Sequence, residues 1–128
     1  MEILAIIPAR GGSKGIKRKN VKLLKGKPLL AYSIEAGLNS KYVTRTVVST
    51  EDSEIKEISL KFGAEVVDRP QELAQDETKT APVMYHTIKE LEKTGYKPDY
   101  IVLLQPTCPL RNGEYIDKAF DFFFENKM

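Results

Sequence analysis

The stretch ILAIIPARGGSKGIKRKN, residues 3–20, decides the fold of this chain. Its first five residues, ILAII, are all apolar, which is typical of a β-strand that is buried on both faces of a sheet. Pro8 and the glycines after it end the strand and begin a loop that carries Arg10 and Lys14. In open parallel sheets ligands bind at the carboxyl ends of the strands, so this loop is the first candidate for a binding site.

Helices and strands alternate along the rest of the chain. Apolar residues recur at helical spacing in several segments, and short apolar runs between them predict further strands. The predicted helices span residues 28–39, 51–62 and 81–94, and the predicted strands span residues 45–49, 64–67 and 100–104. Residues 68–80 are polar without periodicity, which favours a functional loop whose Thr80 caps the next helix. The alternation predicts an α/β fold of three layers, α/β/α, in which right-handed crossovers join the strands of a mainly parallel sheet.

A last helix is predicted after QPTCPLRN, residues 105–112. Its apolar stripe comprises Ile116, Ala119, Phe120, Phe123 and Phe124. This spacing is typical of a helix face that packs on a core, so we interpret the phenylalanines as core rather than as an aromatic binding surface. The stripe still runs when the chain reaches Met128, and no capping signal follows it. We therefore expect the chain to be the N-terminal part of a larger protein.

The composition suits one folded domain over residues 1–128. The chain is 41% hydrophobic and 30% charged and has one cysteine, which excludes a disordered tail, a collagen-like repeat and a disulfide scaffold. It has no apolar run of about 18 residues or more, so no membrane-spanning segment is predicted. The N-terminus lacks the charge-first pattern of a secretory signal, which favours a cytoplasmic location.

The net charge of +2 conceals an uneven distribution. No acidic residue lies between Glu2 and Glu35, although that segment holds many cations. They are Arg10, Lys14, Lys17, Arg18, Lys19, Lys22, Lys25 and Lys27. A basic segment on a mildly acidic body favours an anionic ligand. Nucleic acid is a poor candidate because the cations alternate with glycines rather than with aromatic residues.

The chemistry of the loop suits a triphosphate. The glycines of GGSKG, residues 11–15, let the backbone turn sharply and bring its N–H groups close to phosphate oxygens. Arg10 and Lys14 supply positive charge, and Ser13 supplies a hydroxyl donor. The P-loop pattern is absent, since Gly26 and Lys27 are followed by a proline, and the dinucleotide pattern G-x-G-x-x-G does not occur. The alternative is a basic loop without a ligand.

Four blocks of sequence resemble one family in register. They are IPARGGSKGIKRKN (7–20), VVSTED (47–52), AEVVDRPQELAQDET (64–78) and VLLQPTCPLR (102–111). Together they resemble the acylneuraminate cytidylyltransferases, the CMP-N-acetylneuraminic acid synthetases and their relatives. The 3-deoxy-manno-octulosonate cytidylyltransferases share that fold, but their first loop lacks the GGSKG pattern. The resemblance implies a Rossmann-like nucleotide-diphospho-sugar transferase fold.

The resemblance also implies an activity. Family members transfer CMP from CTP to the anomeric hydroxyl of a sialic-acid-like nine-carbon acidic sugar and release pyrophosphate, with help from Mg²⁺. By that likeness residues 1–128 form a CTP-binding domain, and the metal ligands, the sugar-carboxylate grip and the dimerisation element of a homodimer are expected beyond residue 128. The alternative from a different class is a non-catalytic nucleotide-binding or regulatory module with the same fold.

The family's site residues are carried over position by position. Arg10 and Lys14 would act catalytically by stabilising charge on the triphosphate, and Gln105 would lie between nucleotide and sugar. The full nucleotide-binding set is Ala9, Arg10, Gly11, Gly12, Ser13, Lys14, Asn20, Arg69, Ala74, Asp76 and Gln105. Simpler interpretations exist for some of them. Asn20 suits a turn, Asp76 suits a solvated carboxylate, and Arg69 suits a surface ion pair with Asp68 or Glu72.

The chain's one cysteine, Cys108, and its one histidine, His86, invite comparison with thiol nucleophiles. We reject that interpretation because His86 lies inside a predicted helix and no orienting partner is evident. Cys108 stands where many members of the family carry serine, and a lone buried cysteine is usually inert packing.

Overall fold

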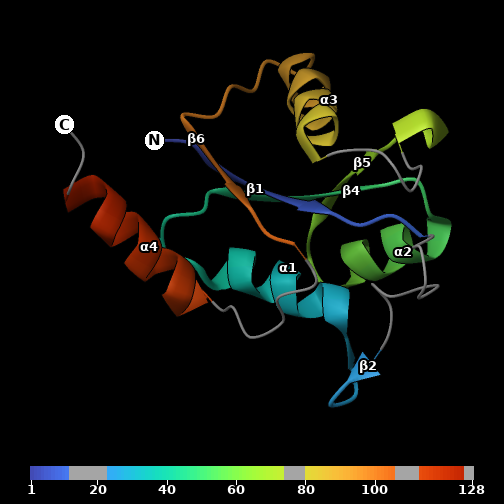
Figure 1. Ribbon diagram of the computed structural model, residues 1–128, viewed down its shortest axis with the longest axis horizontal. Coiled ribbons are helices and arrows are strands. Elements are labelled where there is room, and N and C mark those ends of the chain that lie inside the picture. Colours follow the sequence, from blue (N-terminus) through green and yellow to red (C-terminus); the bar gives the residue numbers. More distant parts are fainter. Residues whose placement is uncertain (12–22, 74–79, 106–112, 126–128) are drawn as a thin grey trace.

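The computed structural model describes residues 1–11, 23–73, 80–105 and 113–125 (Figure 1). Within these ranges the central element is a four-stranded parallel sheet in the order β5-β4-β1-β6. Its strands are β1 (Ile3–Pro8), β4 (Arg45–Thr50), β5 (Glu65–Asp68) and β6 (Tyr100–Leu103). The remaining strands, β2 (Leu23–Leu24) and β3 (Lys27–Pro28), form a small antiparallel pair outside that sheet.

Helices cover both faces of the sheet, so the predicted three-layer α/β/α architecture is confirmed (Figure 1). The helices are α1 (Leu29–Asn39), α2 (Ser53–Lys61), α3 (Thr80–Glu92) and α4 (Gly113–Glu125). In Figure 1, α3 lies above the sheet, and α1, α2 and α4 lie below it. A short 3₁₀ turn, Gln71–Leu73, follows β5.

The central strand β1 is buried on both faces, as its continuous apolar run predicted. Ala5 and Ile7 belong to the core cluster beneath α1, α2 and α4. Leu4 and Ile6 belong to the cluster beneath α3. All four side chains have no exposed surface. Because successive side chains on a strand point to opposite faces, one strand contributes to both hydrophobic cores.

The boundaries of the elements differ from the predicted ones by one or two residues, for local reasons. Helix α2 begins at Ser53 rather than at residue 51 because the Asp52 side chain accepts the Ile55 N–H at 2.9 Å and caps the helix. Gly63, at a φ of +97°, turns the chain away after the helix. Helix α3 contains Thr80 as its first residue, whereas we had expected Thr80 to precede it.

Helix α4 corrects the prediction of a fully buried apolar stripe. Ile116 is 2% exposed, and Phe120 packs against the core beside it. Ala119 is exposed, however, and Phe123 is 45% exposed. The reason is the position of the helix, because α4 packs on α1 and beside β6, the edge strand of the sheet. Only one side of its stripe therefore meets a core.

Polar contacts fix the start of α4 against the end of α1. Asp117 accepts hydrogen bonds from the Ser40 hydroxyl at 2.6 Å and from the Lys41 N–H at 2.9 Å. The Tyr42 hydroxyl donates to Asp121 one turn later. This hydrogen bond raises the pKa of the Tyr42 hydroxyl above its ordinary value. The orientation of α4 is thus set by polar contacts as well as by Ile116 and Phe120.

Among the residues that the structure describes, no helix is long and apolar enough to cross a membrane.

Candidate functional site

The candidate site lies at the carboxyl edge of the sheet, where the predicted residues follow neighbouring strands. Ala9 follows β1, Arg69 follows β5, and Gln105 comes two residues after Leu103, which pairs with Ile6 of β1. Arg10 and Gly11 complete the described set. Gly12, Ser13, Lys14, Asn20, Ala74 and Asp76 lie outside the described residues, so their placement stays a prediction.

Backbone hydrogen bonds draw three strand ends together at this edge. The Ala9 N–H donates to the Ser49 carbonyl at 2.9 Å, which extends the pairing of β1 with β4. The Arg69 N–H donates to the Thr50 carbonyl at 2.8 Å, which extends the pairing of β4 with β5. Ser49 and Thr50 are buried, so these bonds form in an interior environment. Predicted site residues 60 positions apart in the sequence therefore bond to adjacent residues of β4.

The Arg69 side chain is buried and fully directed into the protein. Its Nε donates to the Ser49 hydroxyl at 3.2 Å, its Nη2 to the Ser49 carbonyl at 3.0 Å and its Nη1 to the Leu73 carbonyl at 3.3 Å. Only 6% of the residue is exposed. The alternative of a surface ion pair with Asp68 or Glu72 is therefore wrong, and Asp68 instead pairs with Lys56 at 3.2 Å.

The charge of Arg69 is balanced within the site. Burial is the largest influence and lowers the pKa of the Arg69 guanidinium from its ordinary value. The carboxylate of Glu51 acts in the opposite direction and raises that pKa, while the positive charge of Arg10 lowers it further. A guanidinium remains a cation even under such influences. The edge of the sheet thus holds two neighbouring cations and one compensating anion.

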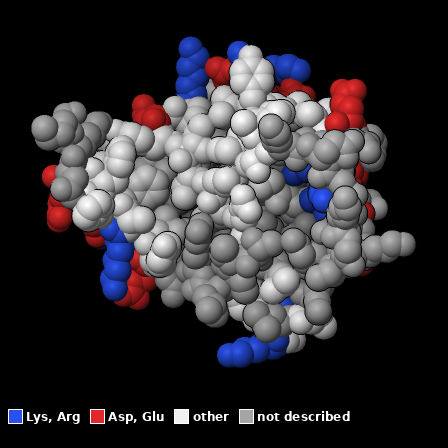
Figure 2. Space-filling view, in the orientation of Figure 1, with Lys and Arg blue, Asp and Glu red and all other residues white. Residues whose placement is uncertain are grey.

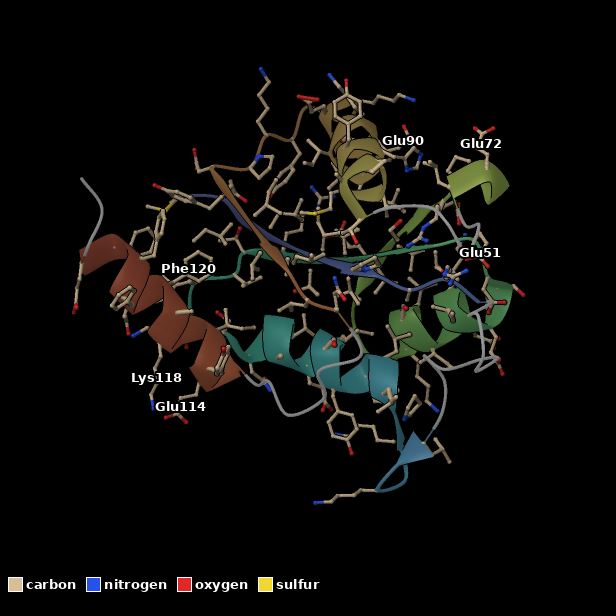
Figure 3. The ribbon with its side chains drawn as sticks, viewed as in Figure 1. Glu51, Glu72, Glu90, Glu114, Lys118 and Phe120 are labelled. Atoms are coloured by element: carbon tan, nitrogen blue, oxygen red, sulfur yellow. The ribbon has the colours of Figure 1, made fainter. Side chains whose placement is uncertain are left out.

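Glu51 is a site residue that sequence reasoning missed. Both of its carboxylate oxygens accept the Gly11 N–H, at 3.1 and 3.0 Å (Figure 3 labels Glu51 at this edge). The signal was present in VVSTED, because an acidic pair directly after a buried strand must lie at its carboxyl end.

The described residues include no group of three or more His, Cys, Asp or Glu side chains that could hold a metal ion. The carboxylates nearest the loop already have partners, since Glu51 accepts from Gly11 and Asp52 accepts from Ile55. The expectation that Mg²⁺ ligands lie beyond residue 128 therefore stays a prediction.

His86 lies inside helix α3, as predicted. Its Nε2 is 3.7 Å from a carboxylate oxygen of Glu90 on the next turn. Cys108 lies outside the described residues. The geometry of His86 is that of a helix-face contact.

A second feature lies between α4 and β6, the strand at the other end of the described sheet from β5. It is an apolar groove of about 320 Å³, lined by residues from both elements. Tyr100, Leu104 and Phe123 are among its lining. Figure 2 shows mostly uncharged side chains over β6, in contrast to the charged side chains toward the periphery. No predicted site residue is among its lining residues.

Comparisons of sequence agree on one family. The cytidylyltransferase family model matches residues 4–128. A pseudaminic acid cytidylyltransferase from Campylobacter jejuni is 40% identical over 99% of this chain and 55% of its own length. An N-acylneuraminate cytidylyltransferase from Escherichia coli is 41% identical over 92% of this chain and 27% of its own length. A CMP-N,N'-diacetyllegionaminic acid synthase from Legionella pneumophila is 39% identical over 93% of this chain and 52% of its own length.

Solved structures share the fold at lower identity. A CMP:2-keto-3-deoxy-manno-octonic acid synthetase complexed with CTP has a TM-score of 0.81 and 18% identity over 98% of this chain and 48% of that chain. A 4-diphosphocytidyl-2C-methyl-D-erythritol synthase has a TM-score of 0.75 and 18% identity over 98% of this chain and 55% of that chain.

The chain spans about half the length, or less, of the curated relatives named above. The match nevertheless runs through the whole described sheet and every element that carries a predicted site residue. The chain therefore belongs to the cytidylyltransferase family.

Proposed function

We propose that this chain is the CTP-binding part of a cytidylyltransferase that transfers CMP from CTP to a sialic-acid-like nine-carbon acidic sugar. The supporting observation is identity of about 40% over nearly the whole chain to relatives named for pseudaminic, N-acylneuraminic and diacetyllegionaminic acids. The carboxyl edge of the sheet supplies the matching chemistry, because Arg10, after β1, and Arg69, after β5, lie near enough for their positive charges to influence each other. A triphosphate needs such neutralisation.

In the proposed reaction the sugar's anomeric hydroxyl releases its proton to water as its oxygen forms a bond to the α-phosphorus of CTP, and the bond from that phosphorus to pyrophosphate breaks. Arg10 and Lys14 would stabilise the negative charge that accumulates on the leaving pyrophosphate. Gln105 would lie between nucleotide and sugar, at the end of β6. Arg69 would hold the ends of β4 and β5 and the turn at Leu73 in place through its three hydrogen bonds. Mg²⁺ would supply further charge neutralisation through ligands beyond residue 128.

We further propose that the complete protein is a homodimer that works in the cytoplasm and does not bind nucleic acid. The first point follows from the family resemblance. The second follows from the pattern of the first ten residues, in which an acidic residue and a short apolar run precede the basic loop. The third follows from cations that alternate with glycines and from a net charge of only +2.

The test is activity of the complete protein with CTP, Mg²⁺ and a panel of acidic sugars. The panel contains N-acetylneuraminic, pseudaminic and N,N'-diacetyllegionaminic acids, and pyrophosphate release is followed together with formation of the CMP-sugar. We expect transfer to at least one of them, and weak CTP binding with little or no transfer by the 128-residue chain. If calorimetry on the folded complete protein detects no CTP binding, the proposal is wrong.

A further inference from the structure

Glu51 makes a contact that ties two loops of the site together. It follows β4 directly, and both of its carboxylate oxygens accept the N–H of Gly11, which follows β1. The two residues are 40 positions apart in the sequence. A backbone N–H that meets a carboxylate forms a charge-assisted hydrogen bond, which is stronger than one between neutral groups. Gly11 also lies within the basic segment, directly after Arg10 and three residues before Lys14.

The packing around Gly11 holds it from a second side. A Cβ atom at Gly11 would lie 2.5 Å from the Oδ1 atom and 2.8 Å from the Cβ atom of Asp52. Asp52 is itself fixed, because its carboxylate caps α2 by accepting the Ile55 N–H. The absence of a side chain at Gly11 thus lets the backbone approach the start of α2 closely enough for its N–H to meet Glu51.

Glu51 also has a place in the charge balance of the site. Arg69 is buried, and the positive charge of Arg10 acts on it unfavourably, whereas the charge of Glu51 acts favourably. Without Glu51, two like charges would face each other at a place where one of them is removed from water. The same carboxylate therefore fixes a backbone position and keeps two cations close together.

We propose that Glu51 is a positioning residue for CTP binding, which holds Gly11 and the neighbouring cations Arg10 and Arg69 in the arrangement that receives the triphosphate. This inference rests on the proposed function. Glu51 acts through the loop and the arginines rather than on the reacting atoms, so it affects the affinity for CTP more than the rate of transfer. Fixing Gly11 before binding reduces the ordering cost that binding would otherwise carry.

Glu51 could also act in the opposite direction and weaken CTP binding. A carboxylate on the Gly11 N–H could act as a competitor that the triphosphate must displace. Its removal would then strengthen CTP binding, whereas removal of a positioning residue weakens it. The direction of the change in KM for CTP separates the two roles.

The experiment compares Glu51→Ala and Glu51→Gln with Glu57→Gln in the complete protein. Glu57 is an exposed residue of the adjacent helix α2 and serves as the matched control for loss of one negative charge. We expect Glu51→Ala to raise KM for CTP about tenfold, with kcat changed by about twofold or less. Glutamine keeps an oxygen acceptor for Gly11, so Glu51→Gln should raise KM by about threefold. Glu57→Gln should match the wild-type protein.

A second measurement does not depend on the reaction. Amide hydrogen exchange, resolved at Gly11 by NMR without nucleotide, should be faster in Glu51→Ala than in wild type. An unchanged or lowered KM in both Glu51 variants overturns the positioning role, as does unchanged exchange at Gly11. A lower melting temperature with unchanged KM would mark Glu51 as merely structural and also overturns it. Failure of the proposed function would look different, because the wild-type protein itself would then bind no CTP.

Discussion

The region at the ends of β4 and β5 and the region beside β6 are packed in different ways. At the ends of β4 and β5 the buried atoms are polar, and Arg69, at 6% exposed, has hydrogen-bond acceptors on Ser49 and Leu73. Beside β6 the side chains that line the groove are mostly apolar, yet Phe123 among them is 45% exposed. A guanidinium is thus enclosed in the protein, whereas an aromatic side chain is open to solvent. The difference teaches that polarity alone does not decide burial, because Arg69 is buried where acceptors meet its donors.

The largest effect on stability is expected when the buried cation Arg69 is removed. Arg69→Ala leaves the Leu73 carbonyl without this donor, removes one of the two donors to the Ser49 carbonyl, and removes one of the two cations that Glu51 balances. We expect a loss of about 3 kcal/mol in the free energy of unfolding, measured by urea denaturation. Arg69→Lys should recover less than half of it, because an ammonium cannot reproduce the spread of three donors. A loss below about 0.5 kcal/mol, typical of surface positions, would contradict the burial of this side chain.

Two glycine substitutions, one at the candidate site and one at the start of α4, separate an effect on CTP binding from an effect on stability. In Gly11→Ala the new Cβ would lie 2.5 Å from Asp52 Oδ1, and in Gly113→Ala it would lie 2.6 Å from the Asn39 carbonyl carbon. Both changes should cost about 2 kcal/mol in unfolding free energy through overpacking. Only Gly11→Ala should also weaken CTP binding, measured by calorimetry on the complete protein. Equal CTP affinity in the two variants would contradict the functional difference between the two positions.

Two aromatic truncations test which face of α4 packs against the core. Phe120 packs against the core and Phe122 is 69% exposed (Figure 3 labels Phe120). We expect Phe120→Ala to cost about 1.5 kcal/mol in the 128-residue chain, because the side chain is half-buried, and Phe122→Ala to cost about 0.5 kcal/mol or less. Thermal unfolding of the two variants under the same conditions provides the measurement. A larger loss for Phe122→Ala would reverse the assignment of the inner face of α4.

The smallest effect concerns a charge pair that, unlike Arg69, lies in water. Lys93 lies 2.6 Å from Glu90 and lowers the pKa of the Glu90 carboxyl below its ordinary value of 4.5. A lowered folded-state pKa stabilises the fold above the unfolded value, and this contribution is lost as the pH falls through the folded one. In an NMR titration Lys93→Ala should return the Glu90 pKa toward 4.5. A titration that does not move would show that solvent screens the pair completely.

Local patterns predicted most of the fold. The apolar run at residues 3–7 and the helical spacing of Leu30 and Ile34 lead directly to β1 and α1, since both signals come from neighbouring residues. The exposure of Phe123 could not be found in this way. Its helical spacing is correct for a core position, but burial also depends on what lies across from the helix.

For the candidate site, local patterns predicted which described residues follow the strands but not the contacts that these residues make. The position of Arg69 after a strand placed it at the carboxyl edge, in agreement with the structure. Its acceptors include main-chain carbonyls, one of them on a residue 20 positions away in the sequence. Because every residue type carries such a carbonyl, no sequence pattern marks the residue that accepts. The bond from Gly11 to Glu51 spans 40 residues and depends on the pairing of β1 with β4. Such contacts follow from the register of the sheet rather than from any local pattern.

The Ser49 carbonyl accepts from both the Ala9 N–H and the Arg69 guanidinium, so one oxygen atom joins three strand ends. Because that oxygen belongs to the main chain, no amino-acid replacement at position 49 deletes it. The neighbouring acceptors at Thr50 and Leu73 have the same property. The junction can therefore tolerate substitutions at position 73, where the main chain accepts, whereas at position 49 the Ser49 hydroxyl also accepts from Arg69 Nε. The donating side chain of Arg69 has no main-chain substitute, so substitution there removes all three hydrogen bonds. Among natural variants of this chain, replacements should accumulate at position 73 well before they appear at Arg69.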